Sequence, residues 1–291
     1  MSKHYKLVIA IRCHDFPLFV LDTVAALFHY ASTAPLVVLS IDNARNRDNR
    51  KQKEVAKVIC KSYPQVRCYL SPQHWGWGPG LYGLLCDTIH WLDKMPDITY
   101  DHFLTIDYDT LFIGEGPDST MLRMAESYKN VGLIGRYIHG KTHWRGVFNR
   151  NKDKIEKLLG EIPPTYVVGE SVHGCSMLLT KAGLAAMKSL GLLSNPFRIV
   201  KKHIPMADDP WTALMIRKTG LDIKGLGGKF SLNWQQASDY ENYIREGYRM
   251  MHPAKVYNNN RVVQIELRCR NFFRKHRDTK LIPEKDVERY Y

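Results

Sequence analysis

Two aspartates flank a single tyrosine directly after an apolar run. The run His102–Ile106 leads into Asp107, Tyr108 and Asp109. A buried strand that ends in this way brings two hard oxygen ligands to one place, and such ligands suit Mg²⁺ or Mn²⁺. Aspartates after a strand also form turns and cap the helix that follows. The elements around the motif must therefore decide between a metal site and a turn.

The residues before this motif alternate apolar, strand-like runs with helical patterns. The alternation predicts an α/β fold in which helices flank a mostly parallel central sheet. Ligands bind such sheets at the carboxyl ends of the strands, so we expect the loops of Arg12, Asp42 and Asp107 to converge on one crevice. The strand-like runs are residues 6–11, 35–41 and 66–70, and the helical patterns are residues 17–30, 53–63 and 81–93.

The second half of the chain contains a basic stretch with several aromatic and histidine side chains, residues 136–154. We interpret this stretch as a long polar loop that serves as a lid or binds an acceptor, because long loops in compact domains are commonly functional. Asp118 or Ser119 is expected to cap a helix that reaches Lys129. The other predicted elements are strands at 131–135, 166–169, 175–180 and 221–225 and helices at 181–190 and 207–218.

The composition is that of a globular protein. Of the 291 residues, 44% are hydrophobic and 24% are charged, which excludes wholesale disorder. The chain has no apolar run long enough to span a bilayer, and its first residues lack the pattern of a secretory signal. Its six cysteines include no C-x-x-C pair, which favours free thiols in a reducing, cytoplasmic setting.

The formal charge of +13 predicts an anionic partner, for which a phosphorylated substrate, a phospholipid surface and nucleic acid are all candidates. Residues 262–276 predict an amphipathic basic helix that either lies on an anionic membrane or packs against the rest of the protein. A nucleic-acid-binding protein should contain a recognisable reading module, and the sequence shows none. We expect a catalytic domain at 1–260, with halves at about 1–115 and 116–260, and a basic tail at 261–291.

Several short motifs follow one another at the expected strand ends. They are Leu39–Asn43, Ile106–Asp109, Gly174–Lys181, Ala207–Trp211 and Met251–Pro253. Taken together over about residues 5–255, they resemble the GT-A fold of glycosyltransferases that use nucleotide diphosphate sugars. The last three motifs are similar to those of the inverting fringe and core galactosyltransferase group. One departure is the D-Y-D sequence at Asp107, where the fringe-like group commonly has D-D-D.

The resemblance implies a donor site that depends on a metal ion. Asp107, Asp109 and His252 would bind the ion, and the histidine nitrogen would favour Mn²⁺ over Mg²⁺. Arg12, Asp42 and Asp107 would contact the nucleotide, which we expect to be UDP. Simpler interpretations remain open, namely an Asx turn at Asp42 and a partly buried histidine beside a proline turn at His252.

The resemblance also implies a general base, because inversion requires a group opposite the leaving diphosphate to take the acceptor's proton. We assign this role to Asp209, with Asp208 as the alternative, although either carboxylate could instead cap the helix that they begin. The acceptor would be a hydroxyl of a glycan or of a lipid-linked glycan, as in polysaccharide biosynthesis. Contact with the inner face of a membrane through residues 261–291 would bring the enzyme to a lipid-linked acceptor.

Two other enzyme classes compete with this interpretation. A retaining glycosyltransferase would keep the metal site and would need no base at Asp209. A nucleotidyltransferase would carry a glycine-rich phosphate loop after the first strand, and residues 12–17 contain no glycine. Trp75 and Trp77 could stack on a sugar or base, but tryptophans near turns more commonly fill the edge of a core.

Overall fold

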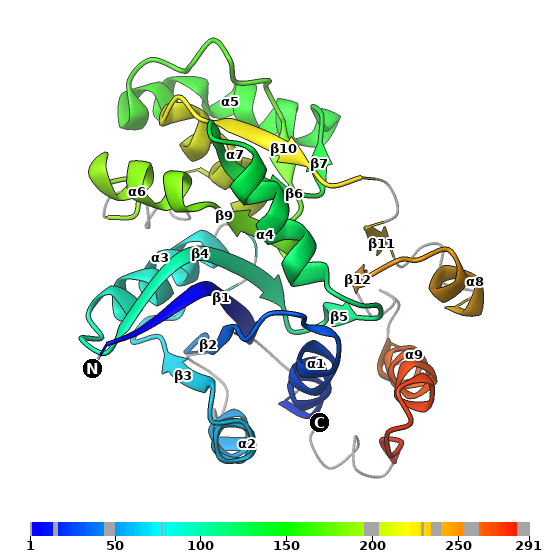
Figure 1. The fold of residues 1–291 in the computed structure, drawn as a ribbon. Coiled ribbons are helices and arrows are strands. Elements are labelled where there is room, and N and C mark those ends of the chain that lie inside the picture. Colours follow the sequence, from blue (N-terminus) through cyan, green and yellow to red (C-terminus); the bar gives the residue numbers. More distant parts are fainter. Residues whose placement is uncertain are drawn as a thin grey trace.

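A seven-stranded sheet forms the centre of the molecule, which we describe from a computed structural model (Figure 1). The structure describes residues 2–13, 17–43, 50–76, 78, 80–194, 204–227, 230–233, 240–252 and 262–283. The strand order is β10-β6-β9-β4-β1-β2-β3. The strands are β1 (Lys3–Cys13), β2 (Leu36–Ile41), β3 (Val66–Leu70), β4 (Ile98–Asp107), β6 (Val131–Gly135), β9 (Met177–Leu179) and β10 (Asp222–Gly225).

Most neighbouring strands of this sheet are parallel. β9 is the exception, because it pairs antiparallel with both β4 and β6. The remaining pairs, β1 with β2 and β4, β2 with β3, and β6 with β10, are parallel. The predicted α/β fold with a mostly parallel sheet is confirmed.

Helices cover both faces of the sheet, and the strand residues alternate between them. Val8 and Ala10 pack with α3 and α7, whereas Ile9 and Ile11 pack with α1, α2 and α4. This period of two is what a strand buried on both faces requires. The helices are α1 (Pro17–Tyr30), α2 (Arg50–Ser62), α3 (Gly80–Asp93), α4 (Pro117–Ser127), α5 (Thr142–Leu159), α6 (Lys181–Ser189), α7 (Asp208–Lys218), α8 (Tyr240–Arg245) and α9 (Val262–His276).

Two short sheets lie outside the central one. The first contains β11 (Ser231–Asn233), β12 (Met250–His252) and β5 (Leu111–Phe112), and the second pairs β7 (Tyr137–Ile138) with β8 (Ser171–Val172). β12 is antiparallel to β5, with Met251 opposite Leu111. This pairing places β12, which comes late in the chain, beside the residues that directly follow β4.

The prediction of a long loop at residues 136–154 is wrong, because this stretch contains β7 and most of α5. The helix buries only a few side chains, among them Phe148, Ile155 and Leu159, and its other face is charged. So sparse an apolar stripe is hard to distinguish from a polar loop by sequence pattern. The predicted strand at 166–169 is also wrong, since β8 begins only at Ser171 and the residues before it form turns.

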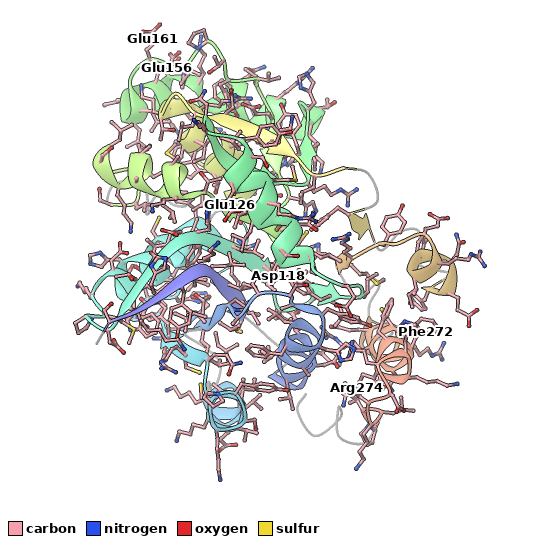
Figure 2. All side chains as sticks on the ribbon, in the orientation of Figure 1. Asp118, Glu126, Glu156, Glu161, Phe272 and Arg274 are labelled. Carbon is pink, nitrogen blue, oxygen red and sulfur yellow. The ribbon has the colours of Figure 1, made fainter. Side chains whose placement is uncertain are left out.

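The helix predicted near Asp118 exists as α4, but Asp118 does not cap it. The N-cap is Gly116 in a left-handed conformation, with no side-chain capping bond. The Asp118 carboxylate instead accepts hydrogen bonds from the backbone N–H groups of Ser32 at 3.0 Å and Thr33 at 2.8 Å. Asp118 therefore ties the start of α4, where Figure 2 labels it, to the loop between α1 and β2.

The C-terminal helix α9 packs beside α1, although the two are far apart in sequence (Figure 1). Phe273 and Cys269 share a small apolar cluster with Leu111, Ile113 and Met251. Among the described residues, no helix combines the length and the apolarity that crossing a bilayer requires.

Candidate functional site

The Asp-Tyr-Asp motif lies where β4 ends beside β1. Asp107 is the last residue of β4 and is paired in register with Arg12 of β1. A turn follows, in which the Thr110 N–H donates to the Asp107 carbonyl at 2.9 Å. Asp107 and Asp109 are both buried. The motif thus combines a strand end and a turn, and both carboxylates lie at the carboxyl edge of the sheet.

Arg12 connects three of the sequence motifs. Its guanidinium lies 2.7 Å from a carboxylate oxygen of Asp107, donates to Asp208, and donates to the Gly174 carbonyl at 2.8 Å. Burial would lower the pKa of Arg12, but the charges of Asp107 and Asp208 outweigh it and raise that pKa. Arg12 is therefore a permanent buried cation that holds β1, β4 and α7 together.

His252 reaches both carboxylates of the motif. Its Nε2 atom lies 3.3 Å from Asp107 Oδ2 and 3.2 Å from Asp109 Oδ1. Burial would lower the pKa of His252, but neighbouring negative groups, including Asp109, outweigh it and raise that pKa. The antiparallel pairing of β12 with β5 places His252 here, because it is the residue after Met251.

Two carboxylates and an imidazole fit a divalent cation by the chemistry of their donor atoms. One ligand atom from each of Asp107, Asp109 and His252 lies within 4.8 Å of the others. Oxygen ligands with one imidazole suit Mn²⁺ or Mg²⁺. Asp208 and Asp209 lie close by, so Arg12 has three carboxylates around it, and Asp109 lies next to one of them, Asp107. This concentration of carboxylates favours a bound cation.

Asp208 and Asp209 are the first two residues of α7, and their N-cap, Ala207, makes no side-chain capping bond. Asp208 is buried and bound to Arg12, whereas Asp209 is half-buried. Burial and the neighbouring charge of Asp208 raise the pKa of Asp209 to about 7. The structure thus gives the two adjacent carboxylates different environments, one neutralised by an arginine and one close to its midpoint at neutral pH.

Gly174 lies at the centre of the site. A Cβ atom at this position would be 2.7 Å from Arg12 Nη2, 2.7 Å from Asp209 Oδ1 and 3.1 Å from Asp208 Oδ2. Arg12 and Asp208 are held by a buried ion pair, so they cannot move away freely. The absence of a side chain at Gly174 therefore allows these groups to meet.

His173 and Cys175 were missed by the sequence reasoning, and both join the site. His173 Nδ1 lies 3.1 Å from Cys175 Sγ, and the rings of His173 and His252 lie 5.0 Å apart. Burial would raise the pKa of Cys175, but His173 and His252 outweigh it and lower that pKa to about 5. The signal in the sequence was the His-Gly-Cys triplet at the start of the glycine-led motif.

Asp42 lies at the end of β2, as expected, and its carboxylate is engaged with the protein. It accepts hydrogen bonds from the backbone N–H groups of Trp75 at 2.7 Å and Gly76 at 2.9 Å, and it lies 3.1 Å from His74 Nδ1. These are the contacts of a loop-ordering residue, and contact with a nucleotide base stays a prediction. Trp75 is buried and donates to Asp87 at 2.6 Å, while Trp77 lies outside the described residues.

The C-terminal helix holds the backbone of the Asp-Tyr-Asp motif. Arg270 of α9 is fully buried and donates to the backbone carbonyl of Tyr108 at 3.1 Å. The same guanidinium donates to Asp22 at 3.0 Å and to Glu266 at 2.9 Å. Tyr108 is the middle residue of the motif, so a residue of the predicted tail holds the backbone between the two aspartates.

Asp22 also binds two further arginines of the C-terminal segment. Arg274, labelled in Figure 2, lies 2.7 Å from it and Arg277 lies 2.8 Å from it. Three of the basic residues that predicted a membrane-binding surface are therefore directed at a buried carboxylate. Exposed basic side chains remain at Arg268, Lys275 and Lys280.

Comparison with known proteins identifies the fold. No protein-family model matches the chain, and no curated protein matches its sequence. The galactosyltransferase LgtC, solved with donor and acceptor sugar analogues, matches with a TM-score of 0.51 and 11% identity over 96% of this chain and 98% of LgtC. The bifunctional glycosyltransferase WbbM matches with a TM-score of 0.50 and 10% identity over 100% of this chain, which spans about half (52%) of WbbM.

A mannosyltransferase from Pyrobaculum calidifontis, solved with GDP-Man and Mn²⁺, gives a TM-score of 0.48 and 12% identity over 78% of this chain and 56% of that protein. The likenesses to LgtC and WbbM show that the chain has the fold of GT-A glycosyltransferases, which confirms the predicted fold. At these identities they do not assign the chain to the fringe-like group.

Proposed function

We propose that the protein is a metal-dependent glycosyltransferase that moves a sugar from a nucleotide diphosphate sugar to a hydroxyl of a glycan or lipid-linked acceptor. The observation that carries this proposal is the convergence of Asp107, Asp109 and His252 at the carboxyl edge of a glycosyltransferase-type sheet. LgtC, which has the same fold, was solved with donor and acceptor sugar analogues. UDP remains the nucleotide that we expect.

On this proposal Asp107, Asp109 and His252 bind Mn²⁺ or Mg²⁺. A cation there would act as a Lewis acid that stabilises the negative charge of the departing diphosphate. Arg12 fixes the position of Asp107 and keeps it ionised, because the two are paired in a buried setting. The contacts of Arg12 make it a positioning residue. That Arg12 also contacts the nucleotide stays a prediction.

Asp209 is the base that we assign for inversion. Asp208 is committed to Arg12, whereas Asp209 is the more exposed of the two and has a pKa raised to about 7. A base with a pKa near the working pH combines the deprotonated form with useful proton affinity. Asp209 would accept the proton of the acceptor hydroxyl as the oxygen attacks the sugar carbon.

A thermal-shift screen of nucleotides tests the proposal. Ligands that bind the folded state stabilise it, so a nucleotide diphosphate with Mn²⁺ should raise the melting temperature more than either alone. The screen should contain UDP, GDP, CDP and ADP, with and without Mn²⁺. If no nucleotide diphosphate shifts the transition in the presence of Mn²⁺, the proposed donor site is wrong.

Product stereochemistry tests the inverting assignment separately. NMR of the product from a donor that supports turnover would give the anomeric configuration of the new bond. Retained configuration would leave the metal site intact and remove the role of Asp209 as the base. The compartment stays a prediction: we expect a cytoplasmic enzyme that can contact the inner face of a membrane.

A further inference from the structure

Three side chains with softer donor atoms lie beside the carboxylate site. One ligand atom from each of His173, Cys175 and His252 lies within 4.8 Å of the others. His173 and Cys175 project from the same short segment, with Nδ1 and Sγ 3.1 Å apart. His252 meets them from β12, its ring 5.0 Å from that of His173. Two imidazoles and a thiol from distant segments thus face one point.

We propose that His173, Cys175 and His252 form a second metal site, selective for Zn²⁺ and similar soft cations. Thiolate and imidazole ligands are those that Zn²⁺ prefers, and three protein ligands leave its fourth position open for water or substrate. Bond lengths of about 2.3 Å to sulfur and 2.0–2.1 Å to nitrogen separate two tetrahedral ligands by about 3.6 Å. His173 Nδ1 and Cys175 Sγ need to move apart by only about 0.5 Å to reach that geometry.

The two metal sites share His252. The Nε2 atom of this imidazole has Asp107 and Asp109 at 3.3 and 3.2 Å, and its ring lies 5.0 Å from that of His173. A site with nitrogen and sulfur donors binds Zn²⁺ more tightly than Mn²⁺. Zn²⁺ on Cys175 would therefore take His252 from the carboxylate pair. The consequence is inhibition of the Mn²⁺-dependent reaction by Zn²⁺, a part of the inference that rests on the proposed function.

The surroundings of the cluster allow a cation to enter. Cys175 is fully buried, but the His252 side chain is 11% exposed and His173 is half-buried. The two histidines are thus the members of the cluster that solvent, and with it a cation, can reach.

Cobalt spectroscopy of the whole chain tests the soft site without any need for activity. Co²⁺ takes the ligands of Zn²⁺, and a thiolate bound to Co²⁺ produces a charge-transfer band in the near ultraviolet. We expect wild-type protein to develop this band and to lose it when Zn²⁺ is added. Cys175→Ser should lack the band and bind Zn²⁺ at least about tenfold more weakly, since loss of even an outer-shell partner weakens metal binding 10- to 100-fold.

The chain supplies a control in a thiol that lies outside the site and is partly buried. Cys68 Sγ lies 2.9 Å from Cys60 Sγ, between α2 and β3 and outside the site. Cys68→Ser should keep both the band and the Zn²⁺ affinity of the wild type. A wild-type spectrum without a thiolate band overturns the proposal, as does a band that survives in Cys175→Ser or disappears in Cys68→Ser.

Activity measurements separate this inference from the proposed function. At a fixed Mn²⁺ concentration, Zn²⁺ should inhibit the wild type and Cys68→Ser alike, and Cys175→Ser should need at least about tenfold more Zn²⁺ for the same fractional inhibition. Equal sensitivity of Cys175→Ser and wild type would contradict competition for His252. A thiolate band in a protein that transfers no sugar would instead refute the proposed function and leave the zinc site standing.

Discussion

Two pairs of aspartates lie at the same edge of the sheet, and their surroundings make them chemically different. Asp107 is next to Arg12 and His252, whose charges outweigh the effect of burial and lower its pKa. Asp209 has Asp208 as its neighbour, and burial with this charge raises its pKa to about 7. Asp107 is held ionised, as the proposed metal ligand requires, whereas the second pair contains a group able to exchange a proton. The placement of cations thus gives the proposed ligand and the proposed base different proton affinities.

The two pairs also differ in the support of their backbone. The Asp107–Asp109 turn is held by the hydrogen bond from Arg270 of α9 to the Tyr108 carbonyl. Asp208 and Asp209 are held by the first turn of α7 and by Arg12. The proposed metal site thus depends on a distant segment of the chain, while the proposed base depends on a local helix start. Substitutions can therefore affect one pair and spare the other.

Loss of a metal ligand should have the largest effect. Asp109→Asn removes one charge from the set of Asp107, Asp109 and His252, and we expect turnover to fall on the order of 10³-fold, about 4 kcal/mol of transition-state stabilisation. Isothermal titration with Mn²⁺ should show weakened binding in parallel. A variant that binds Mn²⁺ normally and turns over normally would remove Asp109 from the metal site.

Loss of the base should have the next largest effect. Asp209→Asn should lower kcat about 10²-fold, the lower end of what a general base contributes, because the acceptor hydroxyl then loses its proton acceptor. Mn²⁺ and nucleotide binding should be nearly unchanged, which distinguishes this variant from Asp109→Asn. Undiminished turnover would favour the retaining alternative.

The pH profile of the wild type tests the same residue. Asp209 must be deprotonated to accept a proton, so kcat/KM should rise about tenfold per pH unit below pH 7 and level off above it, where the pKa of about 7 has been passed. In Asp209→Asn this limb should disappear. A wild-type profile that is flat between pH 5 and 8 would contradict the raised pKa as a feature of the reaction.

Arg12 links the two aspartate pairs, and a side chain at Gly174 should disturb this link. Gly174→Ala puts a Cβ atom 2.7 Å from both Arg12 Nη2 and Asp209 Oδ1, and displacing these groups should lower kcat roughly 10-fold, up to about 10²-fold for a shift of 1 Å. Gly227→Ala is the matched control, because its Cβ would meet nothing within 4 Å. Equal activity of the two variants would show that the site tolerates the extra methyl group.

Loss of the hydrogen bond from Arg270 of α9 to Tyr108 should affect the proposed metal site and not the proposed base. Arg270→Lys keeps the charge but loses the fork that reaches both Asp22 and the Tyr108 carbonyl, so the Mn²⁺ concentration for half-maximal activity should rise about tenfold. Arg274→Lys is the control, because Arg274 binds the same Asp22 and its described bonds do not include Tyr108. Both should lose about 1–3 kcal/mol of unfolding free energy. An equal Mn²⁺ requirement in both variants would make Arg270 a purely structural residue.

The sequence predicted well what depends on local patterns. The strand at 66–70 is β3 with the same bounds, and the helix predicted at 81–93 begins at Gly80. A short, mostly apolar run marks the first, and a three-to-four-residue period marks the second. Asp107, Asp109, Asp208 and His252 were selected from short motifs, and the structure brings them together. Their assigned roles stay predictions.

What the sequence could not supply depends on contacts between distant residues. β5 has two residues and β12 three, too few to show a period, yet their pairing is what delivers His252. The basic pattern of α9 left membrane contact and packing against the protein both open, and charge alone does not reveal that Arg270 finds a buried Asp22 some 248 positions earlier. His173 and Cys175 gain their significance only from the approach of His252.

Membrane attachment is the smallest effect that we expect. Because Arg270, Arg274 and Arg277 bind Asp22, the charge left for lipid on this segment is that of exposed residues such as Arg268, Lys275 and Lys280. Each basic residue near an anionic surface contributes about 1 kcal/mol, so replacing these three by Glu should weaken co-sedimentation with phosphatidylserine vesicles by at least about tenfold. Deleting the tail would be a poor test, because it would also remove Arg270. The triple variant leaves the support of the metal motif in place, so unchanged sedimentation together with unchanged Mn²⁺ dependence would show that α9 serves the active site and not the membrane.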